Sequence, residues 1–290
     1  MIVIVGALIV AGAVFGGFAM GGGHIGVLLQ VAEFVVICGS AAGALIIMSP
    51  RKVLMDMFHQ ALATLKGIPF GKQSYEDLFK ALYELFMLGR RNGMVALEEH
   101  VMTPETSSIF TKYPGFLKDK LGVDLLCNGL RPIIDGKVKP DQLKLLLDTE
   151  LDAMDDEHYK PIDVLTRTAD AMPGFGIVAA VLGIVITMGS ISGPIEDIGH
   201  HVAAALVGTF LGILISYGFL NPLAVNMTFV GMAQMAYYRC IATSVVAFGN
   251  GMAPIMAVEV ARRGLSSEIK PTADALEALV KAASAAPKPA

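Results

Sequence analysis

The stretch ADAMPGFGIVAAVLGIVITMGS, residues 169–190, decides the fold of this chain. From Met172 onward it contains no charged residue, and a helix of about 20 apolar residues is long enough to cross a hydrocarbon core of about 30 Å. Three other stretches of the chain are as long and as apolar. The predicted spans are residues 1–20, 26–48, 172–192 and 202–223. The sequence therefore predicts an all-α integral membrane protein with four transmembrane helices.

The overall composition agrees with a membrane protein. Of the 290 residues, 54% are hydrophobic and only 17% are charged, and the mean hydropathy is +0.62. Soluble domains carry about 25% charged residues. The first apolar stretch has no basic residues before it and no small-residue cleavage site, so we expect a retained span rather than a signal peptide.

The basic residues define the topology. All 22 Lys and Arg lie in two blocks, Arg51 to Arg167 and Arg239 to Lys288. Because Lys and Arg are retained on the cytoplasmic side of a membrane, both blocks are predicted to be cytoplasmic. Residues 21–25 and 193–201 then form short outer loops, and both chain termini lie in the cytoplasm of a bacterial cell, inside its inner membrane.

The spans divide the chain into four predicted parts. These are transmembrane helices 1 and 2 (1–48), a cytoplasmic helical domain (49–171), transmembrane helices 3 and 4 (172–223), and a cytoplasmic C-terminal helical extension with a disordered tail (224–290). Arg239, Asn250 and Pro254 argue against a fifth span in the last part. The tail AASAAPKPA, residues 282–290, is small and proline-containing, which is typical of disorder.

The cytoplasmic part shows two amphipathic patterns and no strand alternation. Each pattern places four large apolar residues at helical spacing. They are Leu78, Leu82, Leu85 and Phe86 in the first, and Leu143, Leu147, Leu151 and Met154 in the second. We therefore expect two helices with one buried face each.

Enzymatic chemistry is not indicated. The sequence has no phosphate loop, zinc constellation, nucleophile elbow or kinase motif, and its three cysteines are too dispersed for a metal or redox pair. His200 and His201 stand beside Glu196 and Asp197, which is either a solvated outer loop or a metal site without a second ligand cluster. No cofactor and no metal are expected, and nothing indicates nucleic-acid binding.

Polar residues inside the spans are candidates for function because they are costly in a bilayer. Glu33 is the one carboxylate well inside a span; it either reaches the interface or a neighbouring helix, or helps to admit protons or cations. Thr187, Thr209 and Tyr217 can line a polar path or bond to their own helix backbone. Counted from the cytoplasmic face, Thr187 and Thr209 are predicted to share one depth.

Two prolines and a charge cluster complete the candidates. Pro173 is expected to open the third transmembrane helix and Pro222 to close the fourth, either as ordinary helix punctuation or as a hinge pair. Arg90, Arg91 and Glu98 lie in LGRRNGMVALEEH. If this segment is helical, Arg91 and Glu98 share a face, as a solvated surface or as a docking surface.

The blocks VAGAVFGGFAMGGG, LLQVAEFVVI, RRNGMVALE, MPGFGIVAAVLGIV and LVGTFLGILISYGFLNPLA resemble, in order and spacing, the family of flagellar motor stator A subunits, MotA, over essentially the whole chain. The resemblance implies a homo-oligomer, with five copies surrounding a dimer of a B subunit, MotB. A single B-subunit helix would carry the aspartate that binds the ion. Ion passage would turn the A ring and push the rotor protein FliG.

The resemblance also assigns roles to individual residues. Arg90 and Glu98 match the charged residues that engage the rotor, with Arg91 as an extra positive charge. Pro173 and Pro222 match two prolines that link protonation to conformational change. The last assignments concern the ion pathway. Thr209 matches the threonine that faces it, Tyr217 lies nearby, Ala180 stands where sodium-driven relatives tend to carry threonine, and Thr187 adds a hydroxyl on helix three.

These matches favour protons over sodium as the coupling ion. Two other functions remain open at this point. An energising subunit similar to ExbB or TolQ usually has three spans and an outer N-terminus, whereas four spans are predicted here. A membrane scaffold without ion coupling would need no polar path.

Overall fold

The computed structural model describes residues 2–189 and 191–285, and this part of the chain folds into helices and turns without a strand. It forms two compact units, which are described separately. The spanning unit comprises Met1–Gly67 and Glu157–Gly231, and the polar unit comprises Ile68–Asp156 and Met232–Ala290. Ser190 and the last five residues of the predicted disordered tail, 286–290, lie outside the described residues.

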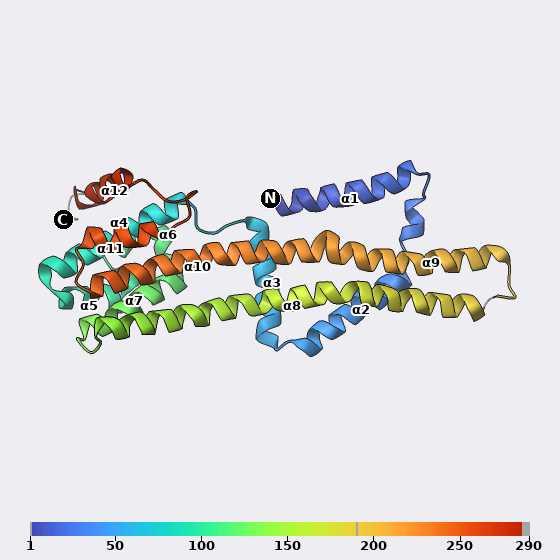
Figure 1. The fold of residues 1–290 in the computed structure, drawn as a ribbon, viewed down its shortest axis with the longest axis horizontal. Helices are drawn as coiled ribbons and strands as arrows, with labels where there is room; N and C mark the ends of the chain where they lie inside the picture. The colour runs from blue at the N-terminus through green and yellow to red at the C-terminus, as the bar shows by residue number, and fades with distance from the viewer. Residues whose placement is uncertain (1, 190, 286–290) are drawn as a thin grey trace. The chain divides into compact units, whose positions relative to one another are not determined.

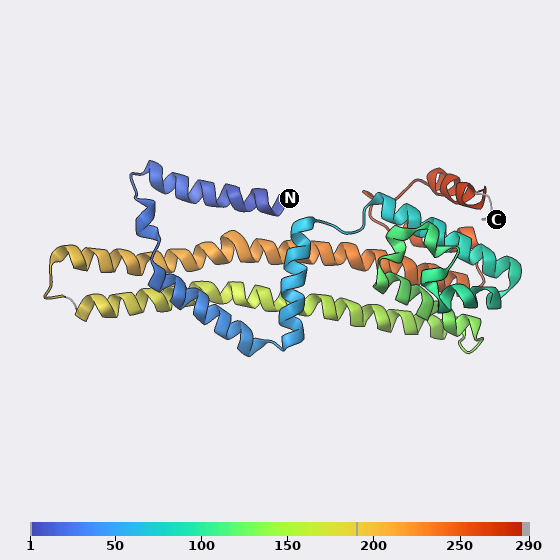
Figure 2. The same ribbon diagram turned by 180° about the vertical axis from the view of Figure 1, so that it is seen from behind.

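The spanning unit is built from long helices, of which two run side by side in both ribbon views (Figures 1 and 2). Its elements are α1 (Ile2–Met20), the 3-10 turn η1 (Ile25–Leu28), α2 (Val31–Met48), α3 (Arg51–Lys66), the second part of α8 (Pro140–Gly189), α9 (Ile195–Ile213), the π-helical segment η5 (Leu214–Leu220) and the start of α10 (Asn221–Gly249). The paired helices are α8 and the continuous run of α9, η5 and α10.

The four predicted spans are confirmed. Four helical segments among the described residues are long and apolar enough to cross a membrane: Ile2–Met20, Ile25–Met48, Asp141–Gly189 and Ile195–Gly249. Helix α1 has no fully buried residue, although Phe15 on one face packs against the core of the unit. The boundaries predicted at residues 48, 171 and 223 describe where the chain crosses the membrane faces. The two compact units are defined by contacts within the protein, so these boundaries stay predictions.

The helix ends predicted at Pro173 and Pro222 are wrong. Pro161 and Pro173 both lie inside α8, a single helix of 50 residues, and Pro222 is the second residue of α10, directly after η5. A proline inside a helix costs about 3 kcal/mol through a lost hydrogen bond and a clash with the carbonyl four residues earlier. Burial of Met172, 3% exposed, and Ala179, 1% exposed, on α8 offsets such a cost.

The outer connection between α8 and α9 is also shorter than expected. Helix α9 begins at Ile195, so most of the predicted loop 193–201 is helical. Glu196 and Asp197 occupy its first turn, where carboxylates interact favourably with the helix dipole. The acidic pair thus lengthens the helix beyond the apolar stretch from which the span was predicted.

The polar unit packs short helices around the start of α8 and the end of α10. Its further elements are α4 (Lys72–Asn92), η2 (Met94–Leu97), α5 (Glu98–Met102), η3 (Pro104–Thr106), η4 (Phe110–Lys112), α6 (Pro114–Leu117), α7 (Lys120–Ile134), α11 (Pro254–Arg263) and α12 (Ala273–Ala285). The two predicted amphipathic helices are confirmed as α4 and the first part of α8.

The core of this unit is aromatic and aliphatic. Phe86 of α4 stacks on Phe248 of α10 with ring centroids 4.3 Å apart, and Phe70 stacks on Tyr237 at 3.9 Å. Such pairs contribute about 0.5–1.5 kcal/mol beyond the burial of their area. Seven of the eight predicted core residues are buried, namely Leu78, Leu82, Leu85, Phe86, Leu143, Leu147 and Leu151, and Met154 packs against them.

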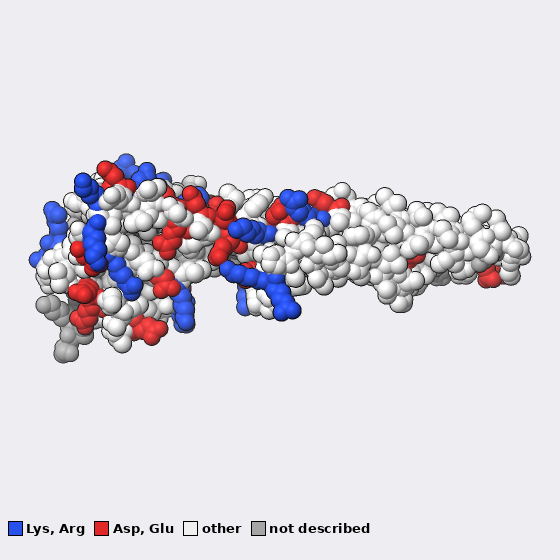
Figure 3. Space-filling model, turned by 90° about the horizontal axis from the view of Figure 1, so that it is seen from below, with Lys and Arg blue, Asp and Glu red and all other residues white. Residues whose placement is uncertain are grey.

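The surfaces of the two units differ in their content of charged residues. On the face drawn in Figure 3, the apolar spans form a surface almost free of charged side chains, whereas both signs of charge are interspersed over the polar unit. Helix α12 contacts α4 and α11 through Leu276 and Val280, each 2% exposed. It runs to Ala285, so residues 282–285 are helical rather than disordered.

Candidate functional site

Helices α8 and α9 approach each other through bare backbone. A Cβ built on Gly212 would stand 2.7 Å from the carbonyl oxygen of Met172 and 3.0 Å from the Cα of Gly176. A Cβ on Gly176 would stand 2.9 Å from the carbonyl oxygen of Gly208. Small residues at such contacts let membrane helices pack closely. The glycine spacing that the sequence shows at 208 and 212 is therefore a contact within the chain.

This contact also sets the depth of the candidate hydroxyls. The Cα of Thr209 lies 3.3 Å from the Cβ position of Gly176, and Gly183 faces Ala205 in the same way. Thr187 is eleven residues beyond Gly176, which is roughly 16 Å along a helix that rises 1.5 Å per residue. The prediction that Thr187 and Thr209 share one depth is wrong.

The environments of these pathway candidates differ. The Thr187 hydroxyl is buried and donates to the carbonyl oxygen of Gly183 at 2.8 Å, so its proton is engaged by its own helix. Thr209 and Ala180 are half-buried on α9 and α8. Tyr217 lies in η5 and is 63% exposed. Thr209 is thus the hydroxyl nearest the glycine contact.

Glu33 lies in the first turn of α2 and is only 6% exposed. Its Oε2 atom has no hydrogen-bond partner among the described residues. It packs against Gly208, where an added Cβ would collide with this oxygen. Glu33 therefore faces a neighbouring helix, α9.

A polar cluster links the surroundings of the two prolines. The side-chain Nδ2 of Asn221 donates to Oδ1 of Asp170 at 3.2 Å and to Oγ of Ser216 at 3.3 Å. Asp170 precedes Pro173 by three residues, and Asn221 precedes Pro222 directly. Sequence reasoning missed this contact, because it joins α8 and α10 across 51 positions of the chain.

In the polar unit the charged candidates are all exposed but do not share a helix. Arg90 and Arg91 lie in the last turn of α4, and Glu98 begins α5. Between them Gly93 adopts φ +87°, a conformation that glycine reaches without strain. The hypothesis that Arg91 and Glu98 share one helical face is therefore wrong, and the three charges lie on either side of a turn.

Helix α5 is held by a buried hydrogen bond. The Ser107 hydroxyl oxygen accepts the backbone N–H groups of Ile109 and Phe110, so its own proton is free to donate to Nδ1 of His100, 2.8 Å away. Burial lowers the pKa of His100, which favours the neutral ring that this bond requires. His100 thus fixes the position of Glu98 two residues earlier.

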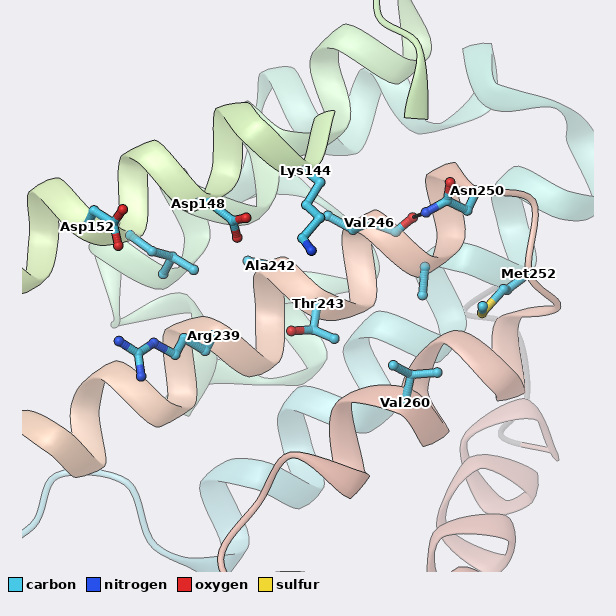
Figure 4. A pocket seen from close by; sticks show the side chains of 12 residues that line it. Lys144, Asp148, Asp152, Arg239, Ala242, Thr243, Val246, Asn250, Met252 and Val260 are labelled. Atoms are coloured by element: carbon cyan, nitrogen blue, oxygen red, sulfur yellow. Dashed lines mark hydrogen bonds between the residues drawn. The ribbon is translucent and has the colours of Figure 1, made fainter. Parts of the chain in front are cut away.

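A hollow of about 560 Å³ opens on the polar unit (Figure 4). Its floor is apolar, formed by residues such as Ala242 and Val246 of α10, and Val260 of α11 closes one side. Its rim carries two cations and two carboxylates, contributed by α8 and α10. They are Lys144, Asp148, Asp152 and Arg239. The lining thus combines apolar side chains with charges of both signs.

The described part of the chain contains no group of three or more His, Cys, Asp or Glu side chains placed to hold a metal ion. His200 and His201 lie in the second turn of α9 rather than in a loop.

Comparison with known proteins gives the family. Residues 4–93 match the family model for the motility protein A N-terminal region, and residues 118–233 match that of the MotA/TolQ/ExbB proton channel family. The N-terminal match favours the motility branch over an ExbB-like or TolQ-like subunit.

Individual relatives cover nearly the whole chain. Chemotaxis protein LafT of Vibrio parahaemolyticus is 40% identical over 94% of this chain and 95% of its own length. Motility protein A of Salmonella typhimurium is 37% identical over 97% and 96%. The flagellar MotAB stator complex from Bacillus subtilis shares the fold, with a TM-score of 0.72, 22% identity and coverage of 94% and 97%. The chain therefore belongs to the motility protein A family, the flagellar motor stator subunits within the MotA/TolQ/ExbB proton channel family.

Proposed function

We propose that this chain and a MotB-type subunit form a proton-conducting complex that turns inward proton flow into torque on the rotor. One observation carries the proposal. The α8–α9 contact is made of glycine backbone, and residues 171–195 and 198–238 contain no Lys, Arg, Asp or Glu. These two stretches therefore carry no ion-binding carboxylate of their own. Glu33 of α2 reaches Gly208, and the resemblance supplies a further carboxylate on the B-subunit helix.

The pathway roles follow from the geometry on α8 and α9. Thr209 lies at the glycine contact and is half-buried, so we assign it to the path, with Tyr217 at the wider η5 turn. Ala180 offers no oxygen ligand, which suits protons better than sodium, because sodium needs several oxygen atoms around it. Thr187 donates to its own backbone, and we assign it to helix packing rather than to ion contact.

The prolines and the cluster beside them are assigned to coupling. Pro173 cannot donate to the carbonyl four residues earlier, and Pro222 follows the π-helical segment η5, a feature that often marks functional sites. The hydrogen bond from Asn221 to Asp170 connects the two regions. A change in protonation on the B-subunit helix can therefore shift α8 and α10 together.

The assembly follows the family. Five copies of this chain would surround a MotB-type dimer in the inner membrane, with both termini in the cytoplasm. The polar unit would face the rotor protein FliG. Its exposed Arg90, Arg91 and Glu98 would meet opposite charges there, because like charges across an interface cost several kcal/mol and opposite charges steer association.

Reversing the charge of both arginines tests the rotor contact. Arg90→Glu with Arg91→Glu is expected to reduce motor rotation at least tenfold, because acidic groups on the rotor would now be repelled. The amount of complex recovered with the B subunit is expected to be unchanged, since both side chains are exposed. Rotation speed and co-purification are measured on the same cells.

The matched control reverses two exposed lysines of the same unit, Lys118→Glu with Lys120→Glu. The two lysines lie away from the arginines along α10. They flank Asp119, which accepts a hydrogen bond from Tyr238, whereas Gly89, next to Arg90, faces Phe248, ten residues further along α10. Unchanged rotation is expected for this pair. Full rotation of the arginine variant would contradict the rotor contact.

A further inference from the structure

One carboxyl group lies among the apolar helices of the spanning unit. Residues 1–50, 171–195 and 198–238 together contain a single Lys, Arg, Asp or Glu, which is Glu33. This side chain is only 6% exposed, and its Oε2 atom has no hydrogen-bond partner in the described part of the chain. An ionised, unpaired carboxylate is very unfavourable in apolar surroundings. The carboxyl group therefore needs something that neutralises it.

A glycine makes room for this carboxyl group. Oε2 of Glu33 occupies the space that a Cβ on Gly208 of α9 would need, and that Cβ would also stand 3.1 Å from the Cβ of Ala179 on α8. Three helices thus meet at the side chain: α2 carries it, α9 leaves space for it, and α8 lies beside it. Because position 208 has no side chain, the carboxyl group lies close to the backbone of α9.

A proton suits this oxygen better than a basic side chain or a metal ion. The three helices carry no Lys or Arg over the ranges given above, so they offer no partner for an ion pair. A sodium ion needs several oxygen ligands, whereas Gly208 and Ala179, which adjoin the carboxyl group, have no side-chain oxygen. A proton needs only one oxygen atom with a free lone pair, which Oε2 provides.

The carboxyl group also lies at the level of the assigned pathway. Gly208 directly precedes Thr209, the half-buried hydroxyl on the path. His201 lies seven residues before Gly208 on the same face of α9, about 10 Å nearer the outer end of the helix, and it is half-buried. It is the nearest titratable side chain along α9. Glu33 is therefore placed beside Thr209, with His201 between it and the outer end of α9.

We propose that Glu33 is a proton-loading site of this chain, which takes a proton from water on the outer side and passes it to the carboxylate of the B-subunit helix. In the first step a hydronium ion gives up a proton, and an O–H bond forms at Oε2. In the second step that bond breaks as the Thr209 hydroxyl accepts the proton and donates its own to the B-subunit carboxylate. The inference rests on the proposed function, because it adds a step to the same proton path.

The first test detects the proton itself. The purified complex of this chain with its B subunit is studied in lipid nanodiscs by infrared spectroscopy at about pH 7, where exposed glutamates, which release their proton at about pH 4.3, are ionised. The difference spectrum between the parent and Glu33→Gln is expected to contain the carbonyl-stretching band of a protonated carboxyl group. The aspartate of the B subunit is present in both complexes and cancels. A difference spectrum without this band would refute a proton at Glu33.

The second test measures the rotation speed of single motors and the amount of complex recovered. Glu33→Gln keeps the shape of the side chain and is expected to slow rotation about tenfold with normal recovery, because a side chain placed for proton transfer typically speeds that step about a hundredfold or more. Val35→Ala is the matched control, since Val35 is 67% exposed two residues further along α2. It is expected to match the parent in both quantities.

A double variant separates proton loading from packing. Gly208→Ala is expected to reduce recovery of the complex, because its methyl group collides with the Glu33 carboxyl group. Glu33→Ala with Gly208→Ala frees that space, so recovery is expected to return while rotation stays slow. Parental rotation of this double variant or of Glu33→Gln would refute proton loading and leave the stator function intact. A parent complex that does not rotate would instead contradict the stator function, and the infrared band would still decide whether Glu33 holds a proton.

Discussion

Gly212→Val is expected to remove the complex from the membrane and to stop motility completely. The valine Cβ would stand 2.7 Å from the Met172 carbonyl oxygen and 3.0 Å from the Gly176 Cα. Both are backbone atoms, so no side-chain rotation can relieve the clash, and α8 and α9 must separate. Overpacking in a core typically costs about 1–3 kcal/mol, and here every contact along the helix pair is lost as well.

The complex recovered by size-exclusion chromatography after co-expression with the B subunit measures this effect. Gly174→Val is the matched control, because Gly174 lies on α8 two residues before Gly176 and an added Cβ there has no neighbour within 4 Å. It is expected to assemble normally. An intact, rotating Gly212→Val complex would show that the glycine contact between α8 and α9 does not exist.

Pro222→Ala is expected to stabilise the protein and yet reduce rotation at least tenfold. In an α-helical register the Pro222 ring would clash with the carbonyl of Gly218, and the π-helical segment Leu214–Leu220 ends two residues before Pro222. Alanine restores the N–H group and removes about 3 kcal/mol of helix penalty. The wide turn would then tighten, and the coupling assigned to it would be lost.

Thermal unfolding of the purified complex and rotation speed of single motors measure the two effects separately. Val225→Ala is the control, since Val225 is exposed on the same helix three residues further on. It is expected to change neither quantity. Parental rotation of a stabilised Pro222→Ala variant would contradict a coupling role for this proline.

The spans and the core helices were predictable because their signals are strong and local. An uncharged stretch of about 20 residues has few alternatives to a spanning helix. The spacing of Leu78, Leu82 and Leu85 specifies which face of α4 is buried, and all three side chains are fully buried. Local periodicity needs no knowledge of the partner element.

Helix ends and depths depend on contacts that the sequence does not show. Proline is a helix breaker on average, yet α8 continues through Pro161 and Pro173 because packing along its length outweighs the local penalty. The level of Thr187 relative to Thr209 follows from the register of Gly176 against Gly212. That register is a tertiary property, so counting from the predicted membrane face gave the wrong depth.

In the candidate site, too, some features were predictable from the sequence and others depend on tertiary contacts. Exposure of Arg90, Arg91 and Glu98 follows from their charge, and glycine, which disfavours a helix interior, stands between them at position 93. The burial of Glu33 against Gly208 carries no such signal, because a carboxylate is usually exposed. The hydrogen bond that joins Asn221 to Asp170 is equally hidden, since it depends on the pairing of α8 with α10.

The most direct test of the central claim is the rotation of tethered cells that lack their own stator and carry this chain with its matching B subunit. Speed is recorded in sodium-free buffer, before and after a protonophore is added. We predict rotation without sodium that stops when the protonophore is added. Rotation only after sodium is restored would contradict the assignment of protons from Ala180, and no rotation in either buffer would contradict the stator function itself.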